Sequence, residues 1–186
     1  MAFGSLVKSD PIILGSGELY LGTIENIEEA EEETIAAALE NIGAIESGAS
    51  VKYTPTTKVI ESANRGIIAK FISKEEVTFN CGIMTWKLEN LERLCPATVT
   101  KDVSKNTKTL KIGKQGSLPV NYLRFVHTKA DGKTLTVNIY KAVAEGGFEL
   151  NFDAENPMSI NHEFTALAKT DGTLIEIVEE FESVGE

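Results

Sequence analysis

Few side chains in this sequence have the types and spacing that catalysis or metal binding requires. The two histidines, His127 and His162, each lie on a predicted strand. The predicted face of His162 is otherwise apolar, which favours a hydrogen-bonded core or interface histidine over a general base. Cys81 and Cys95 form no Cys-x-x-Cys pattern and have no histidine close by in sequence. We therefore predict free thiols, with neither a disulfide framework nor a zinc site.

Two other segments carry residue types that occur in catalytic sites. Gly15-Ser16-Gly17 lacks the Gly-x-Ser-x-Gly spacing of a nucleophile elbow and predicts a turn. Asp153 and Glu155 are close in sequence, as glycosidase carboxylates can be, but Asn156-Pro157 follows directly and predicts an exposed turn. The sequence has no glycine-rich phosphate loop, His-Glu-x-x-His or calcium-loop pattern. We predict no catalytic, cofactor-binding or metal-binding residue and a protein that is not an enzyme.

The charges are unevenly distributed along the chain, whose formal net charge is −10. Residues 25–46 contain eight glutamates and residues 176–186 contain five, with no Lys or Arg in either block. Residues 101–114 instead carry five lysines and one aspartate. Such runs are usually solvated surface. An acidic protein repels nucleic acid, so a DNA-binding groove is disfavoured, whereas a channel through which DNA slides would benefit from that repulsion.

Alternation of apolar and polar residues predicts a mainly β protein of one domain, residues 1–186, with a β-sandwich or barrel-like core and one or two short helices. The clearest strands are 77–81, 135–139 and 148–152, each with one buried face, and Phe79 and Phe152 are expected in the core. The other predicted strands are 12–23, 48–54, 67–72, 109–112, 120–128, 159–168 and 173–180.

Asp-Gly turns predict two hairpins, one joining 120–128 to 134–140 and the other joining 159–168 to 173–180. A helix is predicted over 34–42, ending at Gly43, and another over 86–94, with Thr85 as its N-cap and Pro96 as its stop. Two segments, 54–66 and 96–106, are predicted to be irregular, and the C-terminus is predicted to be a short acidic tail. With no apolar membrane span and no signal peptide, we expect a soluble protein made in the cytoplasm.

Several strings of the sequence resemble major tail tube proteins of long-tailed bacteriophages and prophages. They are PIILGSGELYLGT (11–23), IGAIESGASVKY (42–53), KEEVTFNCGIMTWKLENL (74–91) and LRFVHTKADGKTLTV (123–137). The resemblance extends over nearly the whole chain, and the order and spacing of the segments carry it.

The resemblance implies a structural virion protein of the phage tail whose subunits form rings, expected to be hexameric, that stack into a hollow tube. The partners implied are other copies of the chain, a tape-measure protein, a tail terminator or baseplate, and DNA in transit, with no membrane and no cofactor. By position, 54–66 matches the loop that reaches the neighbouring ring, so we predict it as an assembly arm. Its predicted assembly residues are Thr54, Pro55, Lys58, Val59, Ile60, Glu61, Arg65 and Gly66.

Two other interpretations stay open at this point. One is a different β-rich baseplate or assembly protein, which would not stack rings without limit. The other is a carbohydrate-binding β-sandwich module, which would present an exposed aromatic platform. The candidates for such a platform are Tyr20, Tyr53, Trp86, Tyr122 and Tyr140.

Overall fold

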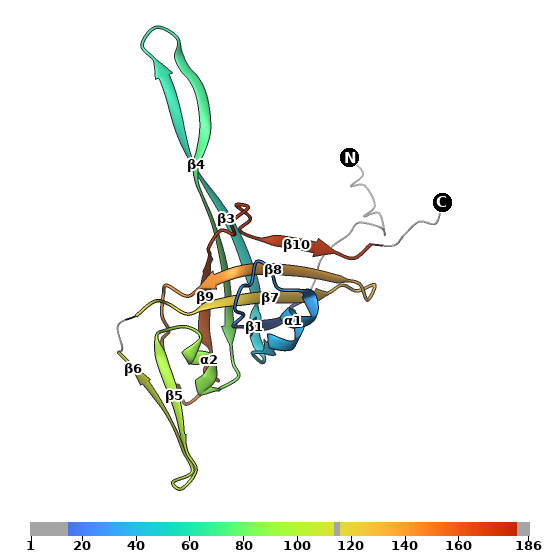
Figure 1. Ribbon diagram of the computed structural model, residues 1–186, viewed down its shortest axis with the longest axis vertical. Helices are drawn as coiled ribbons and strands as arrows, with labels where there is room; N and C mark the ends of the chain where they lie inside the picture. The colour runs from blue at the N-terminus through green and yellow to red at the C-terminus, as the bar shows by residue number, and fades with distance from the viewer. Residues whose placement is uncertain (1–14, 114–115, 182–186) are drawn as a thin grey trace.

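The computed structural model describes residues 15–113 and 116–181, which fold mainly into antiparallel β-strands (Figure 1). The mainly β class with two short helices is confirmed. The elements in chain order are β1 (Glu18–Gly22), α1 (Glu32–Ala38), β2 (Glu40–Asn41), β3 (Ile45–Ser62), β4 (Gly66–Ile83), α2 (Leu88–Glu92), β5 (Ala97–Asp102), β6 (Thr107–Ile112), β7 (Val120–Thr128), β8 (Thr134–Val143), β9 (Ile160–Ala166) and β10 (Glu176–Glu179).

One sheet contains all strands except β5 and β6, in the order β2-β1-β7-β8-β9-β4-β3, with β10 added beside β8. Only the last residues of β8, Ala142 and Val143, pair with β9. The sheet turns at this short junction, so that β1, β7 and β8 cross β4 and β9 (Figure 1). The two halves therefore face each other in a sandwich-like arrangement.

The core lies between these two halves. Leu19, Leu123 and Ile139 come from the first half, Phe79 and Phe164 come from the second, and all five are fully buried in one cluster. The alternation along 77–81 in β4 and along 135–139 in β8 predicted that these two faces are buried in one core, because every second side chain of a strand points to the same face.

The structure moves the boundaries of both predicted helices. α1 begins at Glu32 and ends before Leu39, because Glu40 and Asn41 pair with β1 and leave the helix. α2 has Lys87 in place of Thr85 at its N-cap; the Thr85 hydroxyl instead accepts a hydrogen bond from the Ala44 N–H at 2.8 Å.

Gly43 marks a close approach between two parts of the chain. It has a φ of +118°, and a Cβ at this position would lie 2.1 Å from the Thr85 hydroxyl oxygen. A glycine is therefore required here both for the backbone conformation and for space.

The predicted strand 148–152 is wrong. Phe148 and Leu150 pack against the core, as the alternation suggested, but the segment pairs with no strand and Phe152 is 85% exposed. The chain bends directly afterwards, where the Asp153 carboxylate accepts hydrogen bonds from the Glu155 N–H and the Asn156 side chain. This local turn directs Phe152 away from the core.

The first predicted Asp-Gly hairpin is confirmed. Of the second predicted hairpin, only the turn is confirmed. Gly132 connects β7 to β8, which pair along their lengths. Gly172 also adopts a positive φ of +87°, but β10 pairs with β8 and not with β9. Leu174 and Ile175 pack against the core between the turn and β10, which carries the chain across to β8.

Both segments predicted to be irregular are mostly strands. Residues 97–102 form β5, which pairs with β6 across a turn that contains Asn106 at a positive φ of +52°. Residues 54–62 continue β3, residues 63–65 form the turn, and Gly66 is the first residue of β4. The prediction of an extended loop there is wrong. None of the helices described by the structure is both long and apolar enough to cross a membrane.

Candidate assembly surfaces

The most prominent surface feature is a two-stranded ribbon that projects from the body of the protein (Figure 1). β3 and β4 pair from the core outward to their connecting turn, whereas β9 accompanies β4 only from Thr78 to Ile83. Residues 54–76 consequently extend beyond the rest of the sheet, and we call them the arm. A ribbon of two strands is only marginally stable by itself in water, so contacts with another surface would stabilise the arm.

The arm exposes many large apolar side chains. Six of them are between 42% and 66% exposed: Val59, Ile60, Ile67, Ile68, Phe71 and Ile72. Because side chains alternate between the two faces of a ribbon, both faces carry apolar groups. Single exposed apolar residues are ordinary, but a concentration on one projecting element is typical of an interaction surface.

All eight predicted assembly residues lie on the arm or in its turn. Thr54 and Pro55 are at its base, and the group from Lys58 to Glu61 follows the outer part of β3. Arg65 lies in the turn, and Gly66 is the first residue of β4. The predicted set omitted half of the surface, because the apolar residues of β4 were assigned to a separate strand. The signal that could have identified them is the Asn64-Arg65-Gly66 sequence between two runs of β-branched residues, which is a hairpin pattern.

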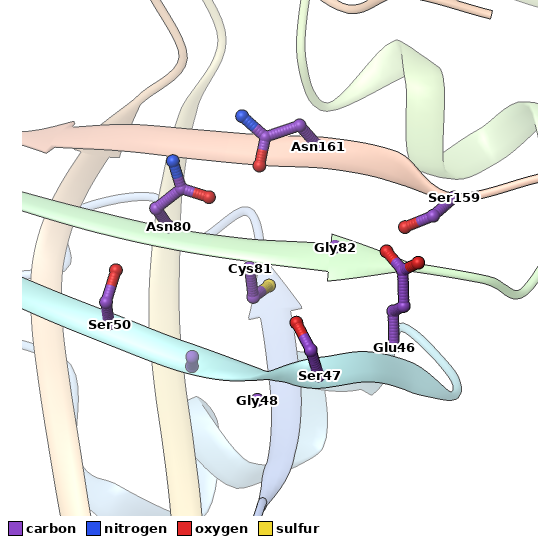
Figure 2. Close-up of a pocket in the computed structure, with 10 residues that line it drawn as sticks. Glu46, Ser47, Gly48, Ser50, Asn80, Cys81, Gly82, Ser159 and Asn161 are labelled. Atoms are coloured by element: carbon purple, nitrogen blue, oxygen red, sulfur yellow. The ribbon is translucent and has the colours of Figure 1, made fainter. Parts of the chain in front are cut away.

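A polar groove lies at the other end of the same hairpin, on the outer face of β3, β4 and β9 (Figure 2). It has a volume of about 450 Å³. Five of its lining side chains are hydrogen-bonding serines and asparagines from three separate parts of the chain: Ser47, Ser50, Asn80, Ser159 and Asn161. One side chain in the groove, that of Glu46, is charged. We call this site the bulge groove.

A β-bulge shapes this groove. Ile45 pairs with Ile83 and Ala49 pairs with Cys81, so the three residues between Ile45 and Ala49 face one residue of β4, Gly82. Bulges redirect side chains, and Gly48 adopts a φ of +110° within this one.

Gly82 forms the floor of the bulge groove. A Cβ at this position would lie 2.6 Å from the Ser159 hydroxyl and 3.0 Å from a carboxylate oxygen of Glu46. Figure 2 shows the Glu46 carboxylate next to Gly82 and Ser159, with Asn80 and Asn161 on the adjacent strands β4 and β9. Among the residues described, Glu46 has no cationic partner. The groove thus offers hydrogen-bond acceptors and one unpaired negative charge.

The second projecting hairpin, β5–β6, is basic. Lys101 lies directly opposite Lys108 in the β5–β6 register, a like-charged pair that is locally unfavourable. The Glu89 carboxylate accepts a hydrogen bond from Lys108, and Lys105 lies 3.4 Å from Asp102. Lys114, the last lysine of the predicted basic run, lies outside the described residues.

Ion pairs hold several of the N-terminal glutamates. The Lys141 ammonium donates to the Glu28 carboxylate, which lowers the pKa of Glu28 to about 2. Arg93 reaches Glu40 at 2.7 Å. The acidic block therefore serves in part to attach the segment between β1 and β3 to the rest of the fold.

The histidines and cysteines occupy buried or partly buried positions. The Nδ1 atoms of His127 and His162 lie 2.6 Å and 2.9 Å from the carbonyl oxygens of Ser16 and Ile160. Burial raises the pKa of the Cys81 thiol to about 12, so it is unreactive at neutral pH. In the part of the chain that the structure describes, no three His, Cys, Asp or Glu side chains converge as metal ligands would.

These observations single out the arm and the bulge groove, which are the two ends of one hairpin. No protein-family model matches the sequence, and no curated protein shows significant similarity to it.

Proposed function

We propose that the chain is a structural subunit of a phage tail tube. In this proposal, copies form rings, expected to be hexameric, and the rings stack into a hollow tube that conducts DNA into the host. The observation that carries the proposal is the arm, a projecting ribbon whose exposed apolar residues have no partner surface among the described residues of the same chain. The resemblance of several segments to tail tube proteins supports the same interpretation.

The arm has the properties expected of an assembly element. Removing apolar surface from water contributes roughly 25 cal/mol per Å². Ile67 and Phe71 are 66% and 48% exposed, so their burial against another copy would contribute to association. Polar groups on the same ribbon, such as Lys58 and Glu61, would keep the free subunit from associating indiscriminately.

The proposed partners follow from this role. The main partner is the chain itself, in rings and tubes within the virion tail after synthesis in the bacterial cytoplasm. A tape-measure protein inside the tube, and a terminator or baseplate at its ends, are expected partners. DNA is expected only in transit, and the acidic net charge of −10 favours its sliding over its binding.

Negative-stain microscopy of the concentrated protein tests the proposal. The wild-type protein is expected to form rings or tubes. A variant in which residues 57–73 are replaced by an Asn-Gly turn should remain monomeric and keep its melting temperature, because the arm lies outside the core. Val103→Ser is a suitable control, since it removes an apolar residue that is 74% exposed on the other hairpin. Tubes formed by the truncated protein would contradict the assembly role.

The two alternatives give different results in the same microscopy experiment. A baseplate-type protein would form closed rings that do not stack. A carbohydrate-binding module would stay monomeric and would use exposed aromatic side chains; Trp86 and Tyr53 are 48% and 51% exposed. The bulge groove itself has no aromatic lining residue, so it lacks the stacking platform that such a module would use.

A further inference from the structure

Arg65 differs from the other arginines of the protein. The sequence has three, and two of them are paired: Arg93 with Glu40 at 2.7 Å and Arg124 with Glu32 at 2.5 Å. Arg65 lies exposed in the turn at the end of the arm and contacts no carboxylate within the described ranges 15–113 and 116–181. A guanidinium carries five N–H donors and is suited to bind several acceptors at once.

The bulge groove has the complementary chemistry. Its Glu46 carboxylate is unpaired, and the Asn80 and Asn161 amides add neutral acceptor oxygens on neighbouring strands (Figure 2). Glu163 adds a second carboxylate beside the groove, because it lies directly opposite Asn80 in the β4–β9 register. An arginine entering here would find a carboxylate for a charge-assisted hydrogen bond and further acceptors for its other donors.

The two sites cannot meet within one molecule. The hairpin register places the arm turn at one end of β3 and β4 and the bulge groove at the other, with strand pairing between them that is interrupted only by register shifts at Thr56/Thr57 and Ile60/Glu61. A contact between Arg65 and Glu46 therefore needs a second copy of the chain.

We propose that the turn of the arm, which contains Arg65, binds in the bulge groove of a second copy, where Arg65 pairs with Glu46. This inference rests on the proposed self-assembly and specifies the residues through which two copies contact each other. The interface is heterologous, since each copy contributes a different surface to it. Every assembly then retains a free turn at one end and a free groove at the other, so copies can be added without limit.

Charge reversal tests the contact. Arg65→Glu or Glu46→Lys alone should raise the protein concentration needed for assembly by about tenfold or more, because each places like charges together in the interface. The combined variant, R65E with E46K, restores opposite charges and should assemble near the wild-type concentration. Light scattering, with microscopy of the products, measures this concentration.

Two matched variants control for general charge effects. Lys70→Glu makes a basic-to-acidic change on the arm away from its turn, and Glu149→Lys makes the opposite change at an exposed site outside the groove. Both should assemble at nearly the wild-type concentration. If Lys70→Glu is as harmful as Arg65→Glu, or if the combined variant is not restored, the proposed pairing is overturned.

Mixing the Arg65→Glu and Glu46→Lys proteins provides a second test. The turn of Glu46→Lys and the groove of Arg65→Glu are both unaltered, so one good contact forms between the two proteins. The turn of Arg65→Glu and the groove of Glu46→Lys also carry opposite charges, so both contacts between unlike proteins are attractive, whereas each variant repels copies of itself. The mixture should therefore assemble near the wild-type concentration although neither variant does so alone, and a mixture that assembles no better than its components would overturn the pairing.

Disulfide cross-linking tests whether the turn and the groove of two copies lie in contact, whether or not tubes form. Arg65→Cys with Ser47→Cys should give linked pairs on mild oxidation, whereas Ser104→Cys, on the turn of the other hairpin, should not link to Ser47→Cys. Linked pairs without tubes would support the contact and oppose the tail tube function. Wild-type tubes with neither linkage nor charge rescue would leave the function standing and overturn this contact.

Discussion

Arg124 holds Glu32 through two parallel hydrogen bonds, Nη1 to Oε1 at 2.5 Å and Nη2 to Oε2 at 2.9 Å. This fork connects α1 to β7 across a sequence separation of 92 residues. Arg124 also donates to the Asn138 side chain at 2.9 Å, which fixes the guanidinium in place. The pair therefore attaches the acidic helix to the sheet.

Glu32→Gln should lower the free energy of unfolding by about 1 kcal/mol or less, because the glutamate side chain is 67% exposed and water screens the pair. The hydrogen bond from Arg124 lowers the pKa of Glu32 below its ordinary 4.5. The stabilisation is thus complete above pH 4.5 and is lost as the pH falls through the folded-state pKa. Urea unfolding at several pH values measures both effects. Glu33→Gln, at the exposed neighbouring position, is the control and should change neither.

Phe79 and Phe152 should respond very differently to truncation. Phe79 is fully buried, and its ring lies 5.7 Å from that of Phe125, so Phe79→Ala should cost about 3 to 5 kcal/mol. Phe152 is 85% exposed, and Phe152→Ala should be nearly neutral. Chemical denaturation of both variants checks the comparison. Equal losses of stability would show that Phe152 itself packs into the core.

His162 should make the fold less stable in mild acid. Burial lowers its pKa below the ordinary 6.5, with a smaller opposing effect from the hydrogen bond to the Ile160 carbonyl. Below pH 6.5 the unfolded chain therefore binds a proton more readily than the folded chain, and stability falls as the pH falls towards the folded-state pKa.

The free energy of unfolding at about pH 7.5 and about pH 5.5 tests this linkage. His162→Gln should be less stable than the wild type at the higher pH but should lose less stability on acidification. If wild type and variant have the same dependence on pH in this window, His162 is not the group responsible.

The strands that could be predicted from sequence are those with one face in the core. Residues 135–139 of β8 alternate in sequence and β9 alternates in burial, and the predicted bounds of β7, β8 and β9 are close to those observed. β5 was missed because Lys101 and its neighbours are exposed on a hairpin that contributes little to the core. The outer part of β3 was missed because Pro55, Asn64 and Gly66 favour turns and because both faces of the arm are solvent-exposed.

The arm and the bulge groove differ in how far the sequence alone could predict them. The arm residues are contiguous, so a positional argument could locate them even though their secondary structure was wrong. The bulge groove combines residues 46–50, 80–82 and 159–161, whose proximity depends on strand register and on a bulge. Strand register is set by pairing across the sheet, and turn residues do not determine it. The Asp171-Gly172 turn predicted that 173–180 pairs with 159–168, whereas β10 pairs with β8.

Strand pairing along nearly its whole length fixes how far the β3–β4 hairpin reaches. At about 3.3 Å per residue, the stretch of β3 from Ser50 to Ser62 spans roughly 40 Å. If the turn of each copy reaches the groove of the next, this length sets the axial repeat of the assembly. A flexible loop of the same composition could contract, whereas a paired ribbon holds its length. Removing two residues from each strand of the arm should therefore shorten the repeat by about 7 Å, and the change would be measurable in images of the tubes.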